Sequence, residues 1–295
     1  MCSSDLFQGD LINEEGGVFD GGQNGVYFGT GDHTGGSFVN RGTVTSDSRA
    51  VNIDGDGLAV VNEGEILGTG DQRNGTVYAD GTADNFSFVN SGTVDAGEGN
   101  NGSAVSLQIG DVASDVVSGT VTNEAGGVFQ GRGDATEGNQ VGDGLRLFTS
   151  QEQATFVGDV VNEGLIAGSD TSDAAAGIRI DGGLDFAGAI RNSGEIRGNV
   201  NAINASDAAD VTVINEVDGV INGDVLLSEG SDVFVDLGET NGDISAGAGD
   251  DVIIAGDQDD VIIGGLGEDV IDGGDGFDTA DFSDLDVSIT VELDE

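Results

Sequence analysis

The chain has 295 residues, and its 56 acidic and eight basic residues give a formal net charge of −48. A charge of this sign and size opposes binding to nucleic-acid phosphates and to anionic membranes. The 54 Gly and the absence of Pro exclude collagen, which needs Pro and a Gly at every third position. No apolar run is long enough to cross a bilayer, so we expect neither a nucleic-acid partner nor a membrane span.

The first six residues, "MCSSDL", look like the translated end of a sequencing adaptor rather than the start of a gene. We therefore exclude residues 1–6 from the fold as a non-native scar. The single Cys of the chain lies in this segment. The remaining sequence cannot form disulfides, and its stability must come from another source.

Residues 7–225 repeat one loose motif, in which an apolar residue and Asn are followed by a few mostly polar residues, Gly, and then Val or Ile. The interval between successive anchors runs from 22 to 39 residues, with short strand-like pieces between them. The anchors are Asn13, Asn40, Asn62, Asn90, Asn123, Asn162, Asn192 and Asn215.

Short strands, frequent turns and a coil length of twenty-odd residues predict an all-β, right-handed parallel β-helix. Asn suits the turns because it tolerates a left-handed backbone and can satisfy turn amides from coil to coil. The alternative is a β-sandwich with Asn-Gly hairpins. The pattern resembles the passenger-like and adhesin-like β-helices of bacterial surface proteins, and loops 131–140 and 169–176 are candidates for contacts with a cell surface or a glycan.

Residues 226–245 are predicted to form a transition coil. The stretch "SEGSDVFVD" around Asp232 looks like a degenerate repeat, although Asp232 and Asp251 are 19 residues apart rather than 18.

From residue 246 to residue 281 the period becomes nine: "AGAGDDVII", "AGDQDDVII", "GGLGEDVID" and "GGDGFDTAD". These four units resemble the hemolysin-type, or RTX, calcium-binding nonapeptide repeat, whose fold is a parallel β-roll.

The resemblance implies that six residues of each unit form a turn, three form a strand, and alternate turns stack on one edge. Asp251 would then pair with Asp269 on one edge, and Asp260 with Asp278 on the other, around Ca²⁺. Glycines would give the turns their backbone conformation and close approach. The implied turn glycines are Gly247, Gly249, Gly256, Gly265, Gly267, Gly274 and Gly276.

Carboxylate and carbonyl oxygens suit Ca²⁺, whereas Mg²⁺ demands stricter octahedral geometry. Residues 246–281 carry eleven carboxylates and no basic residue, so we expect folding of the roll to be coupled to calcium binding. Two departures from the pattern stand out. Ala246 and Ala255 replace the first Gly at little expected cost, while Gln258 replaces the fourth Gly and is expected to weaken the second turn.

Residues 282–295 alternate like a covering strand, and we expect the sequence to be truncated at both ends. The RTX resemblance implies an extracellular bacterial protein that leaves the cell through a type I secretion apparatus.

The enzyme alternative is a fragment of a β-helix polysaccharide lyase or epimerase that carries an RTX module. Such chemistry usually needs a basic or phenolic group among carboxylates. The chain offers only His33, Tyr27 and Tyr78, so we predict no enzyme activity.

Overall fold

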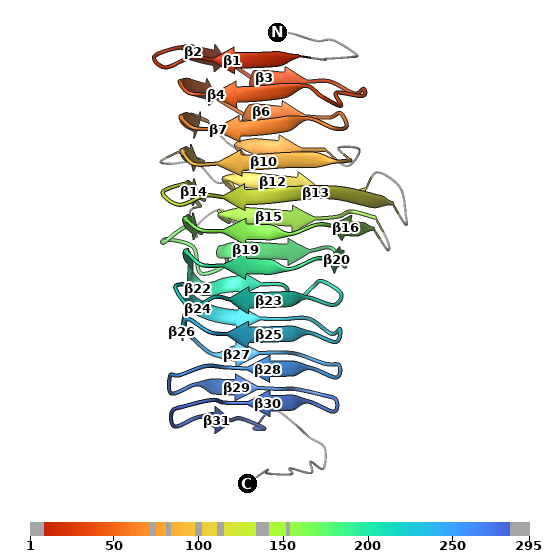
Figure 1. The fold of residues 1–295 in the computed structure, drawn as a ribbon, viewed down its shortest axis with the longest axis vertical. Coiled ribbons are helices and arrows are strands. Elements are labelled where there is room, and N and C mark those ends of the chain that lie inside the picture. The colour runs from red at the N-terminus through yellow and green to blue at the C-terminus, as the bar shows by residue number, and fades with distance from the viewer. Residues whose placement is uncertain are drawn as a thin grey trace.

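The computed structural model describes residues 9–70, 75–80, 84–97, 102–110, 115–133, 142–151 and 154–283. These residues form strands stacked coil upon coil, with the first described strand at one end of the long axis and the last described strand at the other (Figure 1). No helix occurs among them, and hence no helical segment of the length and apolarity needed to cross a bilayer. The predicted segment 1–6, most of loop 131–140 and residues 284–295 lie outside the described part of the chain.

Every pairing between the named strands is parallel, so the fold is a parallel β-helix and the β-sandwich alternative is wrong. Hairpins would have paired neighbouring strands antiparallel. Here each strand instead pairs with the equivalent strand one coil away. The strands form three faces, which we call the first, second and third in chain order within a coil.

The first face carries the asparagine anchors at the ends of its strands. It contains β1 (Asp10–Asn13), β4 (Ser37–Asn40), β7 (Ala59–Asn62), β10 (Phe86–Asn90), β13 (Val116–Asn123), β17 (Val160–Asn162), β21 (Ile190–Asn192), β23 (Thr212–Asn215), β25 (Val233–Asp236), β28 (Val252–Ile254) and β30 (Val270–Asp272). Beside it, β16 (Thr155–Val157) pairs with the start of β13 and with β20 (Asp185–Ala187).

The second face follows each anchor after a short turn. It contains β2 (Val18–Gly21), β5 (Thr43–Ser46), β8 (Glu65–Gly68), β11 (Thr93–Asp95), β14 (Val128–Gln130), β18 (Leu165–Ala167), the first parts of β22 (Glu195–Asn204) and β24 (Val220–Leu226), and β26 (Glu239–Asn241). Within the described residues β26 is the last strand of this face, because it pairs with β24 on one side and with no strand on the other.

The third face completes each coil. It contains β3 (Asn24–Phe28), β6 (Arg49–Ile53), β9 (Val77–Ala79), β12 (Val105–Gln108), β15 (Leu145–Phe148), β19 (Ala176–Asp181), the last parts of β22 and β24, β27 (Ile244–Ser245), β29 (Val261–Ile263) and β31 (Thr279–Ala280).

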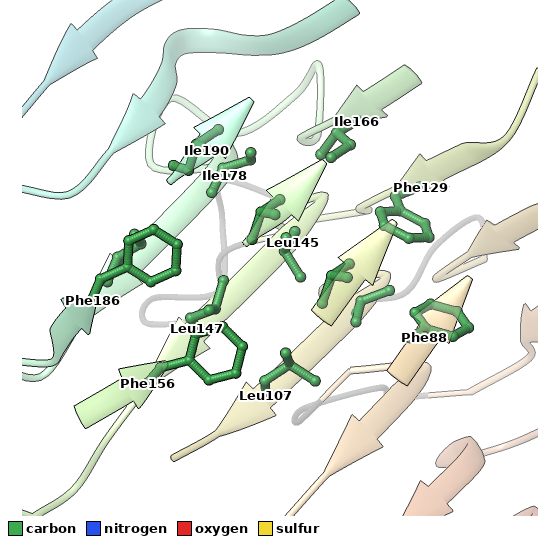
Figure 2. Close-up of a cluster of buried hydrophobic side chains, with 14 of the residues drawn as sticks. Phe88, Leu107, Phe129, Leu145, Leu147, Phe156, Ile166, Ile178, Phe186 and Ile190 are labelled. Atoms are coloured by element: carbon green, nitrogen blue, oxygen red, sulfur yellow. The ribbon is translucent and has the colours of Figure 1, made fainter. Parts of the chain in front are cut away.

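The inward side chains of the three faces form one continuous core. Phe88 stacks on Phe129 with ring centroids 5.6 Å apart, and Phe156 stacks on Phe186 at 5.9 Å. Figure 2 shows these rings with the aliphatic side chains that surround them, carried by neighbouring parallel strands. A single coil could not bury such side chains alone, so each coil depends on its neighbours for stability.

The asparagine anchors form a ladder that runs through the interior. Each side-chain amide donates to the Oδ1 of the anchor in the next coil at 2.7–2.8 Å, and each also donates to nearby backbone carbonyls. From Asn40 to Asn215 the anchors are fully buried. The ladder ends when Asn215 donates to Asp236 at 2.8 Å. The repeated Asn therefore satisfies buried turn groups in one coil after another.

The coils become shorter towards the C-terminus. Stacked residues lie 23 positions apart at Asn192 and Asn215, 21 at Asn215 and Asp236, 19 at Asp232 and Asp251, and 18 at Asp251 and Asp269. The loss of length removes the second face, so the last coils consist of two strands and two turns (Figure 1). The solenoid passes from the β-helix into the roll without a break in the first or third face.

Candidate metal centre in the C-terminal turns

Six-residue turns separate the three-residue strands β28, β29 and β30. We name them by their residues: turn 246–251, turn 255–260, turn 264–269 and turn 273–278. All seven predicted turn glycines have positive φ, between +85° and +145°: Gly247, Gly249, Gly256, Gly265, Gly267, Gly274 and Gly276. Ala246 and Ala255 replace glycines at a position where Gly264 and Gly273 lack positive φ, which explains why Ala is accepted there.

Turn 264–269 stacks closely on turn 246–251. A Cβ on Gly265 would lie 1.8 Å from the carbonyl oxygen of Gly247, and a Cβ on Gly267 would lie 1.7 Å from that of Gly249. These glycines are therefore required by close approach as well as by φ. The approach places turn carbonyls of one coil next to the backbone of the following coil.

The structure brings together both predicted aspartate pairs. On one edge, the backbone N–H of Asp251 donates to Oδ1 of Asp269 at 3.3 Å. On the other, the N–H of Asp260 donates to Oδ1 of Asp278 at 3.0 Å. The sequence spacing of 18 thus places each carboxylate beside the equivalent aspartate of the neighbouring coil.

Two of these carboxylates each have a buried oxygen without a hydrogen-bond partner in the described structure. They are Oδ2 of Asp251 and Oδ2 of Asp260, in residues that are 1% and 3% exposed. Burial raises the pKa of both groups, and the charges of nearby carboxylates add to the effect; the pKa of Asp260 rises to about 6. A buried, unpaired carboxylate is costly, and a bound cation would remove that cost.

The donor set of the turns fits a hard divalent cation. Residues 246–281 contain no Lys, Arg or His that could neutralise the carboxylates. In the described residues no three or more His, Cys, Asp or Glu side chains gather as a metal cluster, so a site here needs backbone carbonyls beside its carboxylates. Carboxylate and carbonyl oxygens are the ligands that Ca²⁺ prefers. The ligand role of each named residue stays a prediction.

Turn 255–260 differs from the other three. Gln258 has no positive φ, whereas the glycines at the equivalent position have φ of +136°, +145° and +134°. Its carbonyl oxygen still faces the next turn, because a Cβ on Gly276 would lie 2.2 Å from it. The substitution therefore changes the backbone of the turn but leaves the stacking in place.

Asp232 belongs to the same edge as Asp251. Its N–H donates to Oδ1 of Asp251 at 2.8 Å, and its own carboxylate accepts from the N–H groups of Ser228 and Val211. The degenerate stretch around Asp232 thus stacks directly on turn 246–251. The spacing of 19 is accommodated without loss of this contact.

The position of Asp236 at the end of the asparagine ladder does not follow from the repeat motif, because that motif contains Asn and Asp236 lies outside the nonapeptides. The signal was nonetheless present: "VDLG" (235–238) repeats the order apolar residue, polar anchor, one residue, Gly, 21 residues after Asn215.

Residues 245–280 match the sequence model of the RTX calcium-binding nonapeptide repeat, in four copies. Comparison with curated proteins and with solved structures gave no match. The C-terminal coils are therefore RTX calcium-binding repeats arranged as a β-roll, and Ca²⁺ is the ion that such repeats bind.

Proposed function

From these calcium-binding repeats we propose that the chain is part of a secreted bacterial protein whose roll folds when it binds Ca²⁺ outside the cell. The observation that carries the proposal is the pair of buried, unpartnered carboxylate oxygens on Asp251 and Asp260. Without a cation, these charges oppose the stacking of the turns. Metal binding to the folded form alone then stabilises the roll by mass action.

Hydrogen exchange of the full chain, measured by mass spectrometry, tests the coupling. We expect Ca²⁺ to slow the exchange of backbone amides in residues 246–281 relative to EDTA. Amides of β17 to β22 serve as an internal control and should change little. Mg²⁺ at the same concentration should protect the turns less, because it requires a stricter geometry. Equal protection of residues 246–281 in EDTA and in Ca²⁺ would contradict the proposal.

Secretion by a type I apparatus is the export route that we propose. Folding that depends on calcium would keep the roll unfolded where calcium is scarce and fold it where calcium is abundant. Fractionation of a producing bacterium, with an antibody against the chain, tests this. We expect the protein in the culture medium or on the cell surface, and its accumulation in the cytoplasm of an actively exporting culture would count against the route.

For the β-helix we propose a structural or adhesive role. Loop 169–176 offers an ordered contact surface, because Ser169 and Thr171 both donate to the carbonyl oxygen of Gly133. Asp170 and Asp173 on this loop are exposed. Binding to a glycan array or to bacterial and host cells, lost on substitution of Asp170 and Asp173, supports adhesion. A chain that binds none of these surfaces retains only the structural role.

We further propose that this chain has no catalytic role. His33 is fully buried, with Nε2 2.7 Å from the carbonyl oxygen of Gly29. The hydroxyl of Tyr27 donates to Asp54, and this hydrogen bond raises the pKa of Tyr27, so less of the phenolate that could act as a base is present near neutral pH. The hydroxyl of Tyr78 donates to Gln108. Turnover of a uronate polysaccharide by the purified chain would instead support the lyase or epimerase alternative.

A further inference from the structure

In the coil where the β-helix meets the roll, two ladders of stacked interior side chains end in a different type of residue from the one that they hold upstream. The first is the asparagine ladder, which ends in Asp236. The second is the inward ladder of the second face, which ends in Thr240 of β26. At each upstream level this ladder holds an apolar residue, in the order Phe19, Val44, Ile66, Val94, Phe129, Ile166, Ile196 and Ile221.

Both replacements leave a buried oxygen without a partner. Oδ2 of Asp236 and Oγ1 of Thr240 have no hydrogen-bond partner in the described structure, and the residues are 1% and 4% exposed. Oδ1 of Asp236 is satisfied, because it accepts from Asn215 and from the N–H of Gly238. The change from Asn to Asp in one ladder and from an apolar residue to Thr in the other therefore places two additional oxygens in the interior of the same coil.

Turn 255–260 follows the segment that holds Asp236 and Thr240 by one coil, because the flanking strands pair in register, Val235 with Ile254 and Ile244 with Ile262. Val235 pairs with Ile254, so Asp236 is level with the first residue of the turn. A Cβ on Gly256 would lie 3.6 Å from Cβ and Cγ of Asp236, which shows that the turn packs on this side chain. The turn carries Asp260, whose Oδ2 is also buried and unpartnered. Asp236 and Asp260 therefore both belong to the corner where turn 255–260 packs on the preceding coil.

The other two interior ladders stay apolar across the same junction. On the first face Val213, Phe234 and Ile253 follow one another, and on the third face Val225, Ile244 and Ile262 do so. The polar replacements are thus confined to the corner that turn 255–260 covers. An unpaired buried carboxylate or hydroxyl costs free energy, and one ligand bound to all three oxygens would remove that cost.

We propose that Asp236, Thr240 and Asp260, together with backbone carbonyls of turn 255–260, hold one hard divalent cation of the calcium class. This site joins the last coil that has three strands, which contains β25, β26 and β27, to turn 255–260 of the roll. Two of its three side chains lie outside the nonapeptide repeats, so it goes beyond calcium binding by the repeats and beyond the proposed secretion and folding role. Two carboxylates and a hydroxyl supply oxygen ligands with a charge that balances one divalent ion.

The number of bound ions tests the site. Asp236→Asn restores the residue that the ladder has in every upstream coil, and Thr240→Val restores an aliphatic side chain, so both variants are expected to fold. Calorimetric titration of the full chain with Ca²⁺ should show one ion fewer for each variant, or one ion bound about tenfold or more weakly. Asp218→Asn, which removes an exposed carboxylate upstream, is the matched control and should leave the titration unchanged.

Asp269→Asn distinguishes this site from the repeats, because it removes a predicted ligand on the other edge. If Asp269→Asn loses an ion while Asp236→Asn and Thr240→Val titrate like the wild type, the repeats bind calcium but the junction site does not exist. Loss of ions in all three variants supports both. A wild-type chain that binds no Ca²⁺ overturns the junction site together with the proposed function.

Stability and diffraction give two further readouts. In EDTA, Asp236→Asn should unfold at a higher temperature than the wild type, because it removes an unpaired buried charge, and it should gain less from added Ca²⁺. Crystals of the calcium-loaded chain should show an anomalous peak among Asp236, Thr240 and Asp260. A water molecule or a proton shared by the two carboxylates gives no anomalous peak, and either finding overturns the metal site.

Discussion

The stability of the β-helix depends most directly on the buried Asn residues of the ladder. Asn123 donates to Asn162, to the carbonyl oxygen of Gly127 and to that of Leu165, and it accepts from Asn90. Each bond replaces one that water would make to the unfolded chain, so its net contribution is modest. Removal of one member is different, because it leaves its buried neighbours unpaired.

Asn123→Ala should therefore lower the free energy of unfolding by about 2–4 kcal/mol. Urea denaturation followed by circular dichroism measures the change. Asn199→Ala serves as the control, because Asn199 is exposed and its side-chain amide donates to the exposed Asp173. We expect this control to change the free energy by less than about 0.5 kcal/mol. Equal effects of the two substitutions would show that the ladder adds nothing to stability.

Asp260 predicts how the metal-free chain responds to pH. Burial, followed by the charge of Asp278, raises its pKa from 3.8 to about 6. The folded state thus binds the proton more tightly than the unfolded state does, and stability rises as pH falls through about 6 towards 4. In EDTA, the wild type should melt at a higher temperature near pH 5 than near pH 7.5. Asp260→Asn should show a smaller rise, and identical rises would contradict this assignment.

At the scale of the element, turn 264–269 depends on Gly267, whereas turn 255–260 has Gln258 at the equivalent position with a different backbone conformation. Gly267 combines φ of +145° with close contact to the carbonyl oxygen of Gly249. Gly267→Ala should distort turn 264–269 and weaken calcium binding about tenfold or more, as measured by calorimetric titration. Gly22→Ala is the control, because Gly22 has no positive φ and a Cβ there would meet no atom within 4 Å. Unchanged affinity of Gly267→Ala would contradict the requirement.

Much of the fold could be predicted because one residue type marks each coil. All eight asparagine anchors lie in the ladder, since a buried amide must be paired in every coil and so recurs in the sequence. The division of each coil into three faces could not be predicted in the same way. The loops between anchors vary in length, so a constant spacing marks neither the second face nor the third, and the pairing of β16 with β20 leaves no repeat at all.

The candidate site shows the same contrast. The contact between Asp251 and Asp269 could be predicted from the nine-residue repeat, because two units make one coil and equivalent residues then stack. Asp236 and Thr240 lie outside this repeat, so it does not predict their positions. Each is a single change in a ladder whose other members are Asn or apolar. The stretch "VDLG" is a sequence signal for Asp236, but the place of Thr240 in its ladder becomes visible only when the strands are aligned in space.

For the whole molecule, the formal charge of −48 acts against compaction. Salt screens this repulsion, since the Debye length falls from about 10 Å at 0.1 M to about 3 Å at 1 M ionic strength. The metal-free chain should therefore melt at a higher temperature as NaCl is raised in EDTA, as measured by scanning calorimetry. Choline chloride should have the same effect, because screening does not require a particular cation. A rise with NaCl alone would indicate specific sodium binding instead.

The one-way direction of the asparagine ladder has a consequence for the size of the protein. Every amide from Asn13 to Asn215 donates towards the following coil, so each coil offers its successor the same hydrogen-bonding surface. Deleting the 22 residues that end at Asn62 would set Asn40 against Asn90 with donor and acceptor still matched. The solenoid can thus gain or lose entire coils while the residues at both of its ends stay the same. Evolution can therefore adjust the length of the solenoid in steps of one coil height.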